Sequence, residues 1–290
     1  IWRMPDLRSR VLFTLGMLAV FRLGVHIPAP GVDREALSTY IESNSDTMFG
    51  LYNMFSGGAL QGFSVFVLGI MPYITASIII QILTVAVPSL ERISKEGQQG
   101  KNRITQYTRY ATIGIALAQG LFMVAMPLEG QRTPAGDNIV LNPGWDFRII
   151  TAITLTAGSC FVMWIGEQIS ERGIGNGSSL IIAAGIVSRL PSAVENTVLS
   201  LRNDEINLLE VTLVCLGMVV VIGLIVYIER AQRRIPIQYA KRVVGAKRNL
   251  PGSQASHLPL KINTAGVIPP IFASSVLMAP ATLLQFSTLP

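Results

Sequence analysis

The feature that most constrains this chain is a stretch of 44 residues, 47–90, that contains no charged side chain. A helix that crosses the hydrocarbon core of a bilayer needs about 20 mostly apolar residues, so this stretch must hold more than one element. Over all 290 residues, 50% of the side chains are hydrophobic and only 14% are charged, whereas a soluble domain carries roughly a quarter charged residues. The sequence is that of a membrane protein.

Seven uncharged or nearly uncharged runs are candidates for membrane crossings, and they predict an all-α polytopic fold. They comprise residues 11–25, 47–90, 110–128, 149–166, 173–188, 211–228 and 262–290. The first run contains one charge, Arg22, which we expect to snorkel to the lipid headgroups from the end of its helix. Pro72 lacks an amide hydrogen and is expected to loosen or kink the second crossing.

Positive charge is shared unevenly between the two sides that these crossings define. Seventeen of the 23 Lys and Arg residues fall on the side of the N-terminus, five fall on the other side, and Arg22 lies within the first run. Short cytoplasmic loops collect Lys and Arg. The N-terminus is therefore predicted to be cytoplasmic, and an odd number of crossings places residue 290 on the opposite side.

Residues 51–62 have the sequence LYNMFSGGALQG, which is too short to cross a bilayer and contains three glycines. Backbone at membrane depth needs hydrogen-bond partners from protein or from water in a cavity. We interpret the segment as a half-inserted helix, and an ordinary loop outside the membrane stays open as the alternative.

Residues 173–177, GIGNG, superficially resemble a phosphate-binding glycine loop. Such a loop follows a β-strand in a βαβ unit, whereas an apolar helix is predicted to precede this one. We therefore interpret it as the tight start of the fifth crossing, with Asn176 or Ser178 as the helix cap.

Residues 230–261 contain eight basic side chains and no acidic one. Apolar and basic residues are mixed over 233–245, and a Leu-Pro-Gly turn signal follows at 250–252, so an extended basic hairpin is predicted. Such a hairpin would meet a polyanion such as RNA. Attraction to anionic lipid is the alternative and stays open.

Ionisable groups are missing where several other functions would need them. The seven runs contain no Asp, Glu or His, which disfavours proton- or cation-coupled transport. The two histidines, His26 and His257, lie apart in the sequence, and Cys160 and Cys215 lie in apolar runs. We therefore expect no metal site, no disulfide framework, no cofactor and no enzymatic activity.

Six longer motifs resemble, in order, the SecY family of protein-conducting channels, the central subunits of the Sec translocon. They are NMFSGGAL (53–60), GIMPYITASIIIQ (69–81), KNRITQYTRY (101–110), GEQISERGIGNG (166–177), YAKRVVG (239–245) and HLPLKINTAGVIPPIFASS (257–275). The resemblance implies an hourglass of about ten helices in two inverted halves, with residues 1–188 as the first half and 189–290 as the start of the second. Helices eight to ten would be absent from this chain.

The resemblance also implies four sets of site residues. The pore ring comprises Ile70, Ile74, Ile182 and Ile271. The plug comprises Asn53, Met54, Phe55, Ser56, Gly57, Gly58, Ala59 and Leu60. The lateral gate includes Thr75, Gln81, Ser274 and Ser275, and the surface for a ribosome or the SecA motor includes Arg233, Arg234, Lys241, Arg242, Lys247 and Arg248. Ser178 stands where relatives commonly have an aliphatic residue, which predicts a leakier or differently staggered ring.

A channel of this kind would pass unfolded secretory polypeptides outward and release hydrophobic segments sideways into lipid. The resemblance implies a plasma-membrane location and a set of partners: the membrane subunits SecE and SecG, the SecA motor, the ribosome, signal peptides, nascent polypeptides and membrane lipid. Two alternatives are a secondary transporter with broken helices for a small solute and a membrane-anchored RNA-binding scaffold. The lack of Asp, Glu and His in the seven runs weighs against the transporter.

Overall fold

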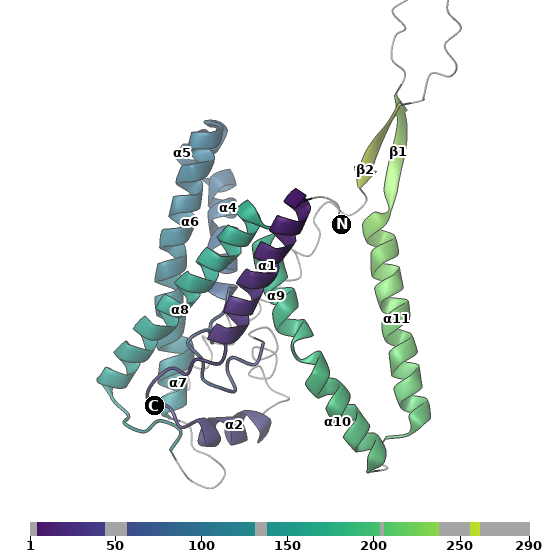
Figure 1. The fold of residues 1–290 in the computed structure, drawn as a ribbon. Coiled ribbons are helices and arrows are strands. Elements are labelled where there is room, and N and C mark those ends of the chain that lie inside the picture. Colours follow the sequence, from purple (N-terminus) through teal and green to yellow (C-terminus); the bar gives the residue numbers. More distant parts are fainter. Residues whose placement is uncertain (1–4, 44–56, 131–137, 204–205, 238–255, 262–290) are drawn as a thin grey trace, which may run out of the picture. The chain divides into compact units, whose positions relative to one another are not determined.

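The computed structural model describes residues 5–43, 57–130, 138–203, 206–237 and 256–261 (Figure 1). The chain divides into two compact units, Ile1–Val194 and Glu195–Pro290. In the described residues the first unit is predominantly helical, and the second contains helical chain followed by a two-stranded sheet.

The first unit is built from helices joined mostly by short connections. They are α1 (Pro5–Gly24), α2 (Arg34–Ser43), α4 (Met71–Ala86), α5 (Pro88–Lys95), α6 (Gln98–Gln119), the π-helix η1 (Gly120–Ala125), α7 (Met126–Glu129), α8 (Trp145–Arg172), α9 (Gly177–Val187) and α10 (Leu190–Arg202), which continues into the second unit. Helix α8 contacts α1, α4, α6, η1 and α9. Because it carries buried residues from Phe147 to Ile169, α8 is the element around which these five helices pack.

Three helical stretches in the described ranges are long and apolar enough to cross a membrane: Trp145–Arg172, Gly177–Arg202 and Leu208–Arg230. The pair α4 and α5, bent by 101°, would make a fourth. Helix α1 is not apolar enough to be counted with these, because it carries four charged side chains. The apolar half of α6 continues into η1 and α7, so it is divided among three elements. The predicted polytopic helical fold is confirmed. The run 262–290 lies outside the described residues, so the number of crossings stays a prediction.

The prediction that Pro72 kinks a long helix is wrong. Helix α4 begins at Met71, so Pro72 lies in its first turn, where an amide hydrogen has no helical partner and the fixed φ of proline suits the helix. The chain bends at the other end of α4 instead, where Val87 is extended and Pro88 begins α5.

Residues 57–70 form turns, and most of them are buried. Their backbone is paired with the segment that follows α1: Ala29 N–H donates to the Phe63 carbonyl at 2.7 Å, and Val65 N–H donates to the Ile27 carbonyl at 3.0 Å. The Ser64 hydroxyl donates to the Gly24 carbonyl at 3.0 Å. These bonds help to satisfy the polar backbone of a segment that has no helix of its own.

Helix α11 (Leu208–Arg230) is the long apolar helix of the second unit, and no residue of it is buried in the described part of the chain. Its first turn is capped by the Glu210 carboxylate, which accepts from the Asn207 N–H at 3.4 Å. A single residue, Ala231, connects α11 to strand β1 (Gln232–Ile237).

Strands β1 and β2 (Ser256–Lys261) pair antiparallel, with Gln232 opposite Lys261 and Ile237 opposite Ser256 (Figure 1). This pairing confirms the predicted basic hairpin at its base. Residues 238–255, between the two strands, lie outside the described residues.

Candidate functional site

Three of the four isoleucines predicted to form the ring meet in one hydrophobic cluster. Ile70 precedes α4, Ile74 lies in the first turn of α4, and Ile182 lies in α9. Ile70 is 4% exposed, whereas Ile74 and Ile182 are partly buried at the edge of the cluster. The other buried members are Phe21, Val25, Ala59, Phe66, Val162, Ile165, Ile169 and Ile181. Ile271 lies outside the described residues, so a closed ring stays a prediction.

Two glycines bring α8 and α9 into backbone contact beside this cluster. A Cβ at Gly177, the first residue of α9, would overlap the carbonyl group of Gly166 in α8. A Cβ at Gly166 would lie 3.2 Å from Cδ1 of Ile70 and 3.5 Å from Cδ1 of Ile181. The missing side chains therefore set how closely α9, with Ile182, approaches α8.

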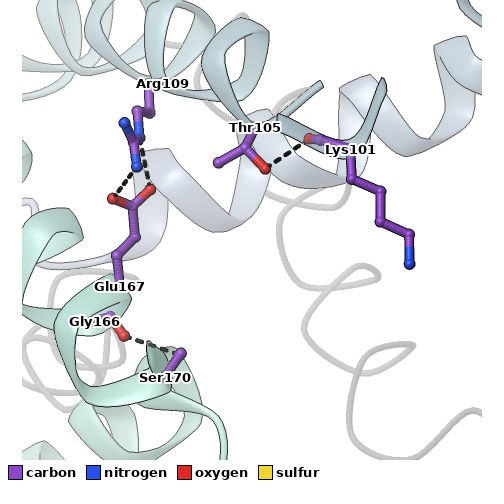
Figure 2. A network of polar contacts seen from close by, with 6 residues as sticks. All are labelled: Lys101, Thr105, Arg109, Gly166, Glu167 and Ser170. Atoms are coloured by element: carbon purple, nitrogen blue, oxygen red, sulfur yellow. Dashed lines mark hydrogen bonds and ion pairs between the residues drawn. The ribbon is translucent and has the colours of Figure 1, made fainter. Parts of the chain in front are cut away.

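Hydrogen bonds fix the connection between α8 and α9. The Ser170 hydroxyl accepts from Gly177 N–H at 2.8 Å and donates to the Gly166 carbonyl at 2.9 Å, the second of which Figure 2 shows. The Asn176 side-chain oxygen accepts from the N–H groups of Ser178 and Ser179 at 3.0 and 3.3 Å. Of the two predicted caps, Asn176 or Ser178, the structure shows Asn176, whose side chain satisfies amides that the first turn leaves without partners.

Helix α1 is tied to the same connection through Thr14. The Thr14 hydroxyl accepts from Ile174 N–H at 3.1 Å, and a Cβ at Gly173 would collide with that hydroxyl. Gly175 has φ +68°, a conformation that favours glycine. The motif GEQISERGIGNG thus encodes a tight three-way junction of α1, α8 and α9.

An ion pair joins α6 to α8 one residue from this junction (Figure 2). The Arg109 guanidinium contacts both oxygens of the Glu167 carboxylate, with Nε–Oε1 2.9 Å and Nη2–Oε2 2.8 Å. The side chain of Glu167 is 13% exposed and that of Arg109 44%. A two-point contact of this kind fixes orientation as well as distance, so it holds α6 against the part of α8 that carries Gly166.

Only the last four residues of the predicted plug, Gly57 to Leu60, are described. They form turns, and Gly57 and Gly58 have φ values of +67° and +87°, which favour glycine. The half-inserted helix expected for residues 51–62 stays a prediction, because residues 51–56 lie outside the described part of the chain. Ala59 is fully buried in the cluster that contains Ile70, and Leu60 is buried in a neighbouring cluster. Asn53, Met54, Phe55 and Ser56 lie outside the described residues.

A contact that the sequence did not predict links α1 to this segment. The Arg22 guanidinium donates from Nη1 to the Gly57 carbonyl at 2.9 Å. The two residues are 35 positions apart, so no local pattern signals the contact. The one sequence feature that points to it is the charge of Arg22 inside an apolar run.

The predicted lateral-gate residues are not brought together among the described residues. Thr75 is partly buried on α4, whereas Gln81 is exposed there and donates from Nε2 to the Ser77 hydroxyl at 3.3 Å. Ser274 and Ser275 lie outside the described residues. This gate therefore stays a prediction.

The predicted docking surface is described only in part. Arg233 and Arg234 are exposed on β1, opposite Leu260 and Pro259. The other four basic residues, Lys241, Arg242, Lys247 and Arg248, lie between the two strands and outside the described residues. Within the described ranges, no group of three or more His, Cys, Asp or Glu side chains could hold a metal ion.

The apolar helices and the buried turns between them define a polytopic helical membrane protein. The family model SecY matches residues 64–289. The chain is 49% identical to the protein translocase subunit SecY of Rickettsia typhi, over 97% of this chain and 64% of that protein. It is 48% identical to the protein of the same name from Escherichia coli K12, over 96% of this chain and 62% of that protein. The chain belongs to the SecY family.

Solved structures share the fold. A structure described as a protein-conducting channel matches with a TM-score of 0.64 at 20% identity, over 93% of this chain and 56% of that one. Sec61 in the canine ribosome-channel complex from the endoplasmic reticulum matches with a TM-score of 0.62 at 20% identity, over 93% of this chain and 56% of that one. The 290-residue chain thus spans somewhat less than two thirds of the length of these relatives.

Proposed function

We propose that this chain is part of a protein-conducting channel that passes unfolded secretory polypeptides across the membrane and releases transmembrane segments sideways into lipid. The observation that carries the proposal is the shared cluster of Ile70, Ile74 and Ile182 with Ala59 at the end of the plug motif. The channel is passive and catalyses no making or breaking of covalent bonds. Its driving energy comes from a partner, either translation or an ATPase motor.

An aliphatic collar suits this task. A narrow apolar constriction dewets and so blocks ions, yet it offers a sliding peptide no strong binding partner. Ile70, Ile74, Ile182 and Ile271 form the collar in this proposal, and residues 53–60 close it. A polar residue such as Ser178 would be expected to make the collar leakier. Its hydroxyl, however, donates to the Asn176 side-chain oxygen at 2.6 Å, so in this proposal it is less available to water in the pore.

The basic hairpin is the proposed docking surface for a ribosome or for the SecA motor. Arg233 and Arg234 are exposed at its base, and four further basic residues follow before β2. One fold relative is Sec61 in a ribosome-channel complex, which supports this assignment. The proposal includes SecE and SecG as membrane partners, a plasma-membrane location, a cytoplasmic N-terminus, and a lateral gate at Thr75, Gln81, Ser274 and Ser275.

Ion flux through the full-length protein in lipid vesicles tests the collar. Ile74→Ser and Ile182→Ser place a hydroxyl in the collar, so they are expected to let water and ions pass while the protein is idle. Ile79→Ser is the matched control because Ile79 lies on α4 but is 42% exposed. Equal flux in all three variants and the wild type would overturn the collar.

A further inference from the structure

Arg22 is a charged side chain at the end of an apolar helix, and it donates to a backbone carbonyl. It lies in the last turn of α1, and its Nη1 donates to the Gly57 carbonyl at 2.9 Å. Among the described residues, the ion pairs join other side chains, and Arg22 is in none of them. The Gly57 carbonyl is therefore the acceptor that holds this guanidinium in the described part of the chain.

Gly57 also lies against α9. A Cβ built on Gly57 would lie 2.9 Å from Cα of Gly185 and 3.6 Å from Nη1 of Arg22. With φ +67°, Gly57 presses its backbone against α9 in a conformation that other residues rarely adopt. The start of this turn thus contacts both α9, through Gly185, and the guanidinium of Arg22.

A second arginine reaches the same turn. Nη2 of Arg189, just after α9, lies 3.8 Å from a Cβ built on Gly58, the residue next to the Gly57 that Arg22 contacts, so both guanidinium groups lie at the same turn. Arg189 forms no ion pair in the described ranges. Two like charges that share a partly desolvated site repel each other, so Arg189 works against the bond that Arg22 makes.

We propose that Arg22 is the anchor of a clamp that holds the turn Gly57–Leu60 in place, and that Arg189 is an opposing charge that keeps this clamp easy to open. Arg22 stabilises the closed turn through a charge-assisted hydrogen bond. Repulsion from Arg189 lowers the cost of breaking it. The clamp itself does not depend on the proposed function. Its expected effect on ion flux does, because that effect requires this segment to be the plug.

Thiol labelling tests the anchor directly. Ala59 is fully buried two residues after Gly57, so A59C in a C160A/C215A background reacts with a maleimide only when the turn opens. Loss of a hydrogen bond from a charged donor shifts such an opening by about tenfold or more. Arg22→Met is therefore expected to speed labelling of the A59C thiol in the full-length protein by about that factor.

Two controls separate release of the turn from other effects. Arg10→Met removes an exposed arginine from the same helix and is expected to leave the labelling rate unchanged. The native Cys160 thiol on α8, tested in a C215A background without A59C, reports general loosening. An unchanged A59C rate in Arg22→Met, or an equal acceleration at Cys160, would overturn the anchor.

Arg189→Gln tests the opposing charge. Removing the repulsion is expected to slow labelling of the A59C thiol severalfold, the opposite of the effect of Arg22→Met. A rate equal to or faster than that of the wild type would overturn the role of Arg189.

Measurements of ion flux then test the clamp and the plug assignment independently. If the clamp and the plug are both correct, Arg22→Met raises flux in the intact protein but adds nothing when residues 53–60 are deleted. Faster labelling without any rise in flux supports the clamp and rejects the plug. Unchanged labelling, together with higher flux after the deletion, rejects the clamp and leaves the plug standing.

Discussion

Gly177 at the start of α9 lies against the carbonyl group of Gly166 in α8, so closely that a side chain at Gly177 would overlap it. The obstacle is backbone rather than the end of a flexible side chain, and it cannot move aside without shifting α8. This contact sets the position of the helix that carries Ile182 and gives the first prediction.

Gly177→Ala is expected to destabilise the protein by about 1–3 kcal/mol, because overpacking at a rigid contact forces backbone shifts. Thermal unfolding in detergent measures the effect. Gly114→Ala is the matched control: Gly114 lies in α6 with no atom within 4 Å of a built Cβ, and alanine there is neutral or slightly stabilising. Similar unfolding of both variants would contradict the close contact.

The Arg109–Glu167 ion pair is expected to contribute to stability as a pair. A double-mutant cycle with Arg109→Gln and Glu167→Gln should give a coupling energy of about 1 kcal/mol, since the contact is two-point and Glu167 is mostly buried. The free energy of unfolding in mixed micelles is the measurement.

The pair Lys95–Glu91 is the control for that cycle. Its side chains are 74% and 48% exposed, so water and salt weaken it and the same cycle should give about 0.5 kcal/mol or less. A coupling at Arg109–Glu167 no larger than this would show that the pair does not fix α6 to α8.

The Asn176 cap predicts which of two substitutions destabilises the protein more. Asn176→Ala removes the oxygen that accepts from Ser178 and Ser179 N–H, and it should cost about 1 kcal/mol. Asn176→Asp keeps the acceptor and adds a negative charge at a helix N-terminus, so it should be close to the wild type. Thermal unfolding of the two variants checks this, and equal destabilisation by both would mean that the cap contributes little.

Charge reversal at the base of the basic hairpin tests its role in docking. Arg233→Glu with Arg234→Glu should weaken ribosome or SecA binding, and the salt dependence of ribosome binding should become shallower by about one unit of slope for each phosphate that the hairpin no longer neutralises. Arg202 is exposed and is predicted to lie on the opposite side of the membrane, so Arg202→Glu should leave ribosome and SecA binding unchanged. Unchanged binding at every salt concentration would leave the hairpin only a topological role.

Local patterns predicted the elements whose cause is local. The uncharged runs 149–166 and 211–228 predicted the two long helices α8 and α11, and the basic, turn-rich composition of residues 230–261 predicted the paired strands β1 and β2. Asn176 was identifiable as a cap because a capping residue acts within three positions of itself. Helix α10 was missed, because its mixture of polar and apolar residues does not form an uncharged run.

Contacts between distant residues were not predictable in the same way. Arg109 and Glu167 are 58 positions apart and Arg22 and Gly57 are 35 apart, so only packing of the helices brings them together. The place of Pro72 depended on where α4 begins, and that is set by the buried turns 57–70 rather than by the apolar run. For the proposed site, the resemblance selected the isoleucines, and the structure adds that three of them share a cluster.

A stalled translocation intermediate tests the central proposal most directly. A secretory precursor with one cysteine is arrested in the full-length protein, and disulfide formation is measured with Ile74→Cys and Ile182→Cys, each in a C160A/C215A background. We expect cross-links from both positions and none from Ile79→Cys on the exposed side of α4. Cross-links from Ile79→Cys alone, or from all three positions equally, would show that the polypeptide does not pass through the isoleucine cluster.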